Sequence, residues 1–248
     1  MQTLKTGLRT LGTPGILADN GRVVGFGDDG LQVRVIPRPQ AVDTIRRHHY
    51  SGRVVNNSYI HLGVFWAGAF SGALQFGYAL NPSSGRRTVA DTGNREYLEL
   101  NRMWIESSVP RNGESKSISY AVKLIKQLYP QVGWIQSFAD ERCGRFGVVY
   151  QASNFLYLGS HKTTFYRLDD QWYHEMLLTA HRKGGTRGQY LRDNINRAEP
   201  GVFRQFRYIY FIKQSARQRL LRPVLPYPKP ETALHANNQT SRETGGKP

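Results

Sequence analysis

The alternation of apolar and polar positions is most regular in the middle of the chain, where it predicts the central part of the fold. Apolar side chains fill 97–105 as in a strand, and then recur at three- and four-residue spacing from Ile118 to Tyr129, as on one face of a helix. A second apolar run at 133–139 predicts another strand, and a shorter helix is expected around 146–153. Strand, helix and strand joined by short polar loops are typical of a parallel βαβ unit.

Two polar loops follow the predicted strands of this unit, at 107–117, which is rich in Ser, and at 140–150, which contains Gly144 and Gly147. Ligands of open α/β sheets bind outside the carboxyl ends of the strands. We therefore expect a crevice lined by these two loops, and we expect the active site of an enzyme to lie there.

The rest of the chain has shorter patterns of the same kind. Turn signals in 1–30 predict a β-hairpin or a loosely packed arm. Further elements are predicted as a strand at 31–36, a helix at 40–50, hairpins at 60–80 and 163–174, and a last strand at 206–212. This order resembles the GNAT acyltransferase fold, which implies an α/β (α+β) class: a central mixed, twisted sheet with helices on both faces.

The predicted organisation is one catalytic domain over 1–222. It includes the N-terminal arm and a basic C-terminal extension at 181–222. From residue 223 to 248 the chain is rich in Pro, Asn, Thr and Gly, so a disordered tail is expected there.

The charge of the chain points to a polyanionic partner. The formal net charge is +16 and the sequence pI is about 10.2, an excess that attracts and steers nucleic acid. The alternative is a chain that is basic only for solubility. No run of eighteen apolar residues and no signal peptide are present, and Cys143 is the only cysteine. These observations predict a protein of a reducing cytoplasm, without membrane association, disulfides or a cysteine-based zinc site.

The extension at 181–222 interleaves basic residues with aromatic ones. Arg and Lys neutralise phosphates and aromatic rings stack on unpaired bases. The alternative is a solvated basic face on a strand whose aromatics belong to the core. We expect the aromatics to be mostly core and the charges mostly phosphate-facing, and the candidate DNA-binding residues are Arg182, Lys183, Arg187, Arg192, Arg204 and Arg207.

Several short pieces of sequence, in their joint order, resemble the bacteriophage Mom family of DNA-modifying proteins. The pieces are 48–51 (His-His-Tyr-Ser), 99–102 (Glu-Leu-Asn-Arg), 115–119 (Ser-Lys-Ser-Ile-Ser), 138–140 (Phe-Ala-Asp), Gly144, Gly147 and 150–155 (Tyr-Gln-Ala-Ser-Asn-Phe). The resemblance runs from about residue 31 to 215. It implies an enzyme that places a carbamoylmethyl (acetamido) group on N6 of adenine in double-stranded DNA, in the host cytoplasm, so that the DNA escapes restriction.

Four residues are candidates for catalysis. Asp140, at the end of a predicted strand, is a candidate base for the adenine amine, or else it caps the following helix. Tyr50, beside His49, could donate to a leaving group, bind a metal, or stack on a flipped base; the alternative is a helix-end tyrosine packed on the sheet. Tyr150 lies where GNAT-type enzymes often keep a general acid, or else it belongs to the core.

A second set of residues is expected to hold the donor of the transferred group. In the GNAT family a glycine-containing loop before the central helix binds the pyrophosphate of acyl-CoA, and 111–117 is a weak version with one glycine, Gly113. Ser115 and Lys116 join it, although Ser115 is also the best simple N-cap. Arg102 either holds a donor phosphate or pairs with a carboxylate such as Glu99 or Asp140.

The identity of the donor stays open between acetyl-CoA and another activated acyl or aminoacyl compound. An iron site at Tyr50 and Asp140, with the neighbouring histidines, is a further hypothesis, although no His-x-Asp or HExxH spacing supports it. A homodimer is also left open. Two other functions are compatible with the sequence: a GNAT enzyme that acetylates a protein or small molecule, and a DNA-binding protein without catalytic activity.

Overall fold

The computed structural model describes residues 5–10, 13–79, 83–144, 146–179 and 185–229. The chain forms two compact units. Unit 1 comprises 1–137, 148–156 and 208–224, and unit 2 comprises 138–147, 157–207 and 225–248. The single domain over 1–222 stays a prediction.

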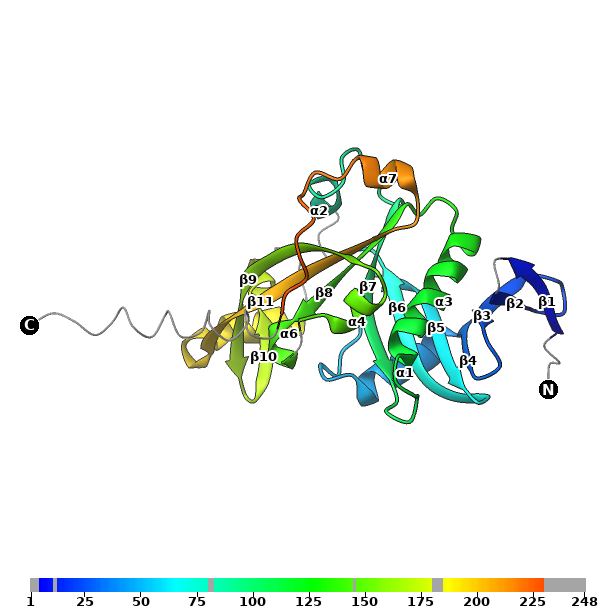
Figure 1. Ribbon diagram of the computed structural model, residues 1–248. Coiled ribbons are helices and arrows are strands. Elements are labelled where there is room, and N and C mark those ends of the chain that lie inside the picture. Colours follow the sequence, from blue (N-terminus) through cyan, green and yellow to red (C-terminus); the bar gives the residue numbers. More distant parts are fainter. Residues whose placement is uncertain (1–4, 11–12, 80–82, 145, 180–184, 230–248) are drawn as a thin grey trace, which may run out of the picture. The chain divides into compact units, whose positions relative to one another are not determined.

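Unit 1 is built on a mixed sheet whose strands follow one another in chain order, from β1 to β8 (Figure 1). Every neighbouring pair from β1 to β7 is antiparallel, and β7 and β8 are parallel. The strands are β1 (Lys5–Thr10), β2 (Thr13–Leu17), β3 (Val23–Gly27), β4 (Leu31–Val35), β5 (Ser58–Trp66), β6 (Ala69–Gly77), β7 (Tyr97–Ile105) and β8 (Trp134–Asp140), of which β8 continues into unit 2.

Both faces of this sheet are covered. Leu62 and Ala73 point to opposite faces, since Ala73 pairs with Gly63, and both are fully buried. Helix α1 (Arg38–His48) packs through Ala41 on Ala73, whereas α3 (Gly113–Leu128) contacts β3 and β4. The shorter helices of unit 1 are α2 (Ser83–Arg86), α4 (Val148–Ala152) and α7 (Gln214–Gln218). The predicted mixed α/β class, the parallel βαβ unit and the amphipathic central helix are confirmed.

Some predicted boundaries were wrong. Helix α1 begins at Arg38, not at residue 40, because Pro39 lies in its first turn, where a missing N–H costs nothing. The N-terminal arm contains a hairpin between β2 and β3, closed at Ala18 and Gly21, as predicted.

The parallel pairing of β7 and β8 is short. It covers three residue pairs, from Tyr97 with Trp134 to Glu99 with Gln136, although β7 continues to Ile105. The Ser137 hydroxyl still reaches the carbonyl of Leu100 at 3.3 Å. The carboxyl half of β7 therefore continues beyond its paired part.

The turn between β3 and β4 is tied to α3 by one carboxylate. Asp28 accepts hydrogen bonds from the backbone N–H groups of Gly30 and Leu31 and from the Tyr120 hydroxyl at 2.8 Å. Partial burial acts to raise the pKa of Asp28, but these hydrogen bonds outweigh it, and the pKa is lowered. Burial and the bond to Asp28 raise the pKa of Tyr120 to about 12.

Replacing this carboxylate is expected to destabilise unit 1. Asp28→Ala leaves three donors without their acceptor and should lower the free energy of unfolding by about 1–3 kcal/mol, measured in urea, whereas Asp29→Ala in the same turn should change it little. Because the folded pKa is depressed, the stabilisation is present above the unfolded pKa and is lost as the pH falls through the folded one. Equal effects of the two substitutions would contradict this role.

Unit 2 contains a long hairpin and two short helices. Strands β9 (Leu156–Leu168) and β10 (Gln171–His174) pair through a turn at Asp169 and Asp170, which both have positive φ. Strand β11 (Glu199–Phe211) is the neighbour of β9 and begins earlier than the predicted strand at 206. The helices are α5 (Met176–Thr179) and α6 (Thr186–Asp193), with 3-10 turns at Glu141–Cys143 and Ile195–Arg197. Leu156 and the end of β11 belong to unit 1.

The segment from residue 223 was predicted to be disordered. Within it, the Leu225 N–H donates a hydrogen bond to the carbonyl of Tyr157 at 2.9 Å. Residues 230–248 lie outside the described part of the chain. In the described ranges, no helix has the length and apolar character needed to cross a membrane.

Candidate active site

The segment after α1 brings the predicted residues His49 and Tyr50 to β7. The ring of His48 stacks on Trp104 of β7 with centroids 4.2 Å apart, and His49 closes the helix by donating its N–H to Ile45. Arg102, also on β7, donates from Nε to the carbonyl of Arg53 at 2.9 Å and from Nη1 to the carbonyl of Asn101 at 2.6 Å. The end of α1 and the following loop are thus fixed to the carboxyl half of β7.

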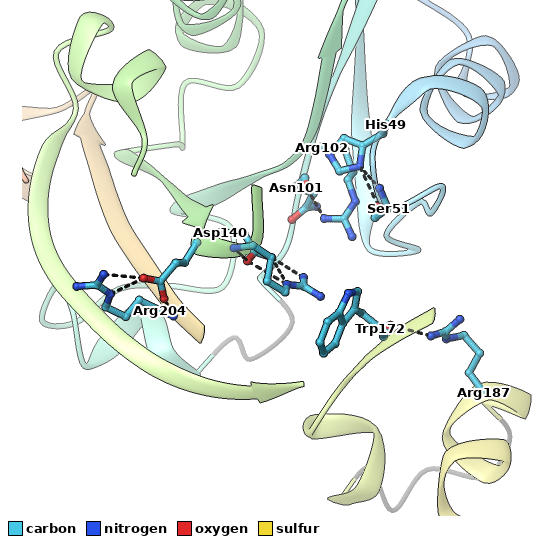
Figure 2. A network of polar contacts seen from close by, with 10 residues as sticks. His49, Ser51, Asn101, Arg102, Asp140, Trp172, Arg187 and Arg204 are labelled. Atoms are coloured by element: carbon cyan, nitrogen blue, oxygen red, sulfur yellow. Dashed lines mark hydrogen bonds and ion pairs between the residues drawn. The ribbon is translucent and has the colours of Figure 1, made fainter. Parts of the chain in front are cut away.

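His49 is held in one orientation by Ser51. Its Nδ1 accepts the Ser51 backbone N–H at 3.2 Å and lies 2.8 Å from the Ser51 hydroxyl (Figure 2). Since Nδ1 is an acceptor, the neutral ring carries its proton on Nε2. Burial, together with the charge of Arg102, lowers the pKa of His49 to about 4. At neutral pH His49 is therefore a neutral hydrogen-bond donor through Nε2.

This environment predicts a low titration point. Because the folded pKa lies below that of the unfolded chain, the unfolded chain takes up the proton first, so the contribution of His49 to stability is complete above about pH 6.5 and declines toward pH 4. Ring-nitrogen NMR, assigned with a His49→Gln variant, should show a neutral Nε2–H ring at pH 6. Arg102→Gln should raise the midpoint, and a wild-type midpoint above 6 would refute the assignment.

Tyr50 is exposed over 65% of its surface, so the alternative that it packs on the sheet is wrong. Its ring lies against that of His49 with centroids 4.3 Å apart. An aromatic face presented to solvent on a fixed support is available for stacking on a base.

Tyr150, on α4, packs as the alternative of a core residue predicts. Its ring packs against Phe155 and Tyr208, at 5.6 and 5.4 Å between centroids, as a core residue would. Burial raises the pKa of Tyr150, while a hydrogen bond with Ser137 opposes the shift. The role of Tyr150 as a general acid stays a prediction.

The loop before α3 differs from the predicted donor site in two ways. Ser115 is not the N-cap: Asn112 occupies that position with φ of 68°, and the Ser115 hydroxyl donates to the Asn112 carbonyl at 3.0 Å. Gly113 is needed for packing, since a Cβ there would lie 2.3 Å from Val109 Cγ1, and its N–H already donates to Pro110. Lys116 is exposed, 3.9 Å from the carboxylate of Asp28.

In unit 2, Asp140 is the cap of the 3-10 turn that follows β8, as the alternative reading proposed. Its Oδ1 accepts the Arg142 N–H at 3.0 Å, and the Arg142 guanidinium contacts both carboxylate oxygens. Arg142 in turn lies 3.5 Å above the Phe165 ring. Asp140 is thus an oriented and ion-paired carboxylate. The crevice between 107–117 and 140–150 stays a prediction.

The described arginines that were predicted to face phosphates make contacts with groups within unit 2. Arg204 forms an ion pair with Glu141, donating from Nε at 2.9 Å and from its backbone N–H at 2.7 Å. Arg187 donates to the Trp172 carbonyl (Figure 2) and to the Gln171 side chain. Arg192 donates to the Leu177 carbonyl. Arg207 lies 4.9 Å from the Phe138 ring. The assignment of Arg187, Arg192, Arg204 and Arg207 to DNA phosphates stays a prediction, and Arg182 and Lys183 lie outside the described residues.

Three contributors to these networks were missed from the sequence: Ser51, Arg142 and Trp172. Ser51 was in the quoted His-His-Tyr-Ser piece, and the spacing of Asp140 to Arg142 is that of a local cap, so both had a signal. Among the described residues no three His, Cys, Asp or Glu side chains gather into a group that could hold a metal ion, so iron has no structural support.

The fold is that of a mixed α/β protein, with polar groups on the loops after α1 and β7 in unit 1 and, separately, after β8 in unit 2. A family model described as the Mom protein family matches residues 30–229, and the chain belongs to that family. It is 55% identical over 224 residues, 89% of this chain and 93% of the relative, to the protein named methylcarbamoylase mom of Escherichia phage Mu.

Solved acetyltransferase structures are more distant. A ribosomal-protein-S5-alanine acetyltransferase from Vibrio fischeri matches 77% of this chain and 98% of its own, with 11% identity and a TM-score of 0.46. Arabidopsis thaliana NAA60 in complex with a bisubstrate analogue matches 73% of this chain and 97% of its own, with 10% identity and a TM-score of 0.45.

Proposed function

We propose that this protein is a transferase that places a carbamoylmethyl group on N6 of adenine in double-stranded DNA. The observation that carries the proposal is membership of the Mom family together with 55% identity to the phage Mu methylcarbamoylase. The net charge of +16 supports a nucleic-acid substrate. In a phage-infected cell the modified DNA would escape restriction, and the protein would act in the host cytoplasm.

In the proposed reaction the N6 amine forms a bond to the methylene carbon of the transferred group and loses one proton, while the donor loses its leaving group. Asp140 accepts the amine proton after Arg142 releases the carboxylate, and Tyr150 supplies a proton to the leaving group. Tyr50 stacks on the adenine once it has left the duplex. His49 donates a hydrogen bond from Nε2 to an oxygen of a substrate.

The step above needs a donor whose leaving group is bonded to the methylene carbon beside the carboxamide. Acetyl-CoA itself would transfer its acetyl group through the carbonyl carbon and give an acetylated adenine. Arg102, Ser115 and Lys116 are proposed to contact the donor. Arg102 supports this role because its guanidinium is fixed on β7. The N–H of Gly113 is already bonded, so we assign that residue to the shape of the loop.

The test is the base composition of DNA from cells that contain the protein. Plasmid DNA from a bacterium expressing wild type is digested to nucleosides and analysed by mass spectrometry. A carbamoylmethyl-deoxyadenosine is the expected product. An acetylated deoxyadenosine would indicate ordinary acetyl transfer, and unmodified deoxyadenosine from folded protein would favour a DNA-binding role or another acceptor.

A further inference from the structure

Two segments far apart in sequence join in unit 1, beside the amino end of β7. Helix α2 and the residues after it meet the chain that follows α7 through an antiparallel bridge between Val89 and Leu220. The Ala90 N–H donates to Arg219 at 2.8 Å, and the Leu221 N–H donates to Thr88 at 2.9 Å. Figure 1 shows α2 and α7 side by side.

This junction, which we call the α2–α7 surface, concentrates positive charge. Its two acidic residues are Asp91 and Glu96, and Glu96 is bonded to Arg219 and to the Gly93 N–H. Six further basic side chains are exposed on the segments 83–96 and 213–222: Arg86, Arg87, Arg95, Lys213, Arg217 and Arg222. Such a cluster repels itself in the free protein, and a bound polyanion relieves that repulsion.

The surface is also hollowed. A depression of about 490 Å3 is lined by Arg86, Ala90, Asp91, Thr92, Gly93 and Leu221. Arg86 is fixed in its wall, because Nε donates to the Thr92 carbonyl at 3.3 Å, and among the described residues its Nη groups have no hydrogen-bond acceptor. A preorganised guanidinium in a hollow is suited to a phosphate oxygen.

We propose that the α2–α7 surface binds the phosphodiester backbone of duplex DNA. This inference rests on the proposed function and names a contact surface for its substrate. The surface adjoins Glu96 at the amino end of β7, whereas His48 stacks on Trp104 near the carboxyl end. Eight residues of strand separate these points, roughly 26 Å at 3.3 Å per residue. The contact therefore reaches phosphates several base pairs from the adenine that Tyr50 would meet.

Two features favour this surface over the basic stretch at 181–222. The side chains of Arg187, Arg192 and Arg204 hydrogen-bond to groups within unit 2, which engages part of each guanidinium. Counted along the sequence, unit 1 holds 20 basic and nine acidic residues, and unit 2 holds 14 and nine. The larger excess of positive charge is thus in unit 1.

The experiment compares two triple variants of the full chain. Arg87→Gln/Arg217→Gln/Arg222→Gln removes charge from the α2–α7 surface, and Arg22→Gln/Lys126→Gln/Lys162→Gln removes the same charge from exposed positions elsewhere. Affinity for a duplex of about 30 base pairs is measured over a range of salt. The slope of log K against log salt should fall in magnitude by about 2–3 for the first variant, and much less for the second.

Equal slopes for both variants, with unchanged thermal stability, would overturn the proposal. If the first variant loses binding to anionic vesicles or to single-stranded RNA but keeps duplex binding, the proposal is overturned in favour of those partners. Failure of the proposed function is seen separately, as the absence of modified deoxyadenosine in cells with wild type. The salt slopes do not depend on that result.

Discussion

Asp140→Asn is expected to remove most of the DNA modification while the chain stays folded. Asn is as good an N-cap as Asp, so its side-chain oxygen can still accept the Arg142 N–H that Asp140 binds at 3.0 Å. The amide cannot take a proton from an amine. Since general-base catalysis contributes about 10²–10⁴-fold, the yield of modified deoxyadenosine per unit of protein should fall by that factor.

The substitution separates the two roles that Asp140 could have. Asp140→Ala removes both the cap and the base, and should lower activity and the melting temperature together. Asp170→Asn, in the exposed turn between β9 and β10, is the control for loss of a carboxylate. Wild-type modification by Asp140→Asn would show that Asp140 serves only as a cap.

Arg204→Ala is expected to destabilise the protein without weakening DNA binding. The side chains of Arg204 and Glu141 are only 18% and 25% exposed, and the loss leaves the Glu141 carboxylate with one of its bonds. Partial burial acts to raise the pKa of Glu141, but the bonds from Arg204 outweigh it and lower the pKa. The carboxylate is therefore charged at neutral pH. Breaking a buried pair costs about 3–5 kcal/mol, and solvent screening here reduces our expectation to about 2–3 kcal/mol.

A double-mutant cycle with Glu141→Ala measures the coupling directly, by urea unfolding. The cost of Arg204→Ala should be much smaller when Glu141 is already absent. If stability is unchanged and the salt slope of DNA binding falls by about one, Arg204 contacts phosphate, as the sequence first suggested.

The sequence predicted the elements whose signals are local. The apolar spacing from Ile118 to Tyr129 is the buried face of α3, and the Asp169–Asp170 pair closes a hairpin. The pieces resembling the Mom family led to the family that the chain belongs to.

What the sequence could not supply was the partner of each charged group. Arg204 was counted as a free cation because its partner, Glu141, lies 63 residues away. The α2–α7 surface brings the segments of Arg86 and Arg222 together through a β-bridge that no local sequence pattern predicts. In 111–117 several residues can cap a helix, and the structure places Asn112 at the N-cap with φ of 68° and no side-chain capping bond.

Gly113 and Val109 restrict the order in which this loop can evolve. A side chain at 113 would collide with Val109 Cγ1, so in a chain like this one position 109 must first become smaller. Only then can residue 113 change without loss of stability. The two positions should therefore vary together across descendants of this protein, with a larger residue at 113 found only beside alanine or glycine at 109.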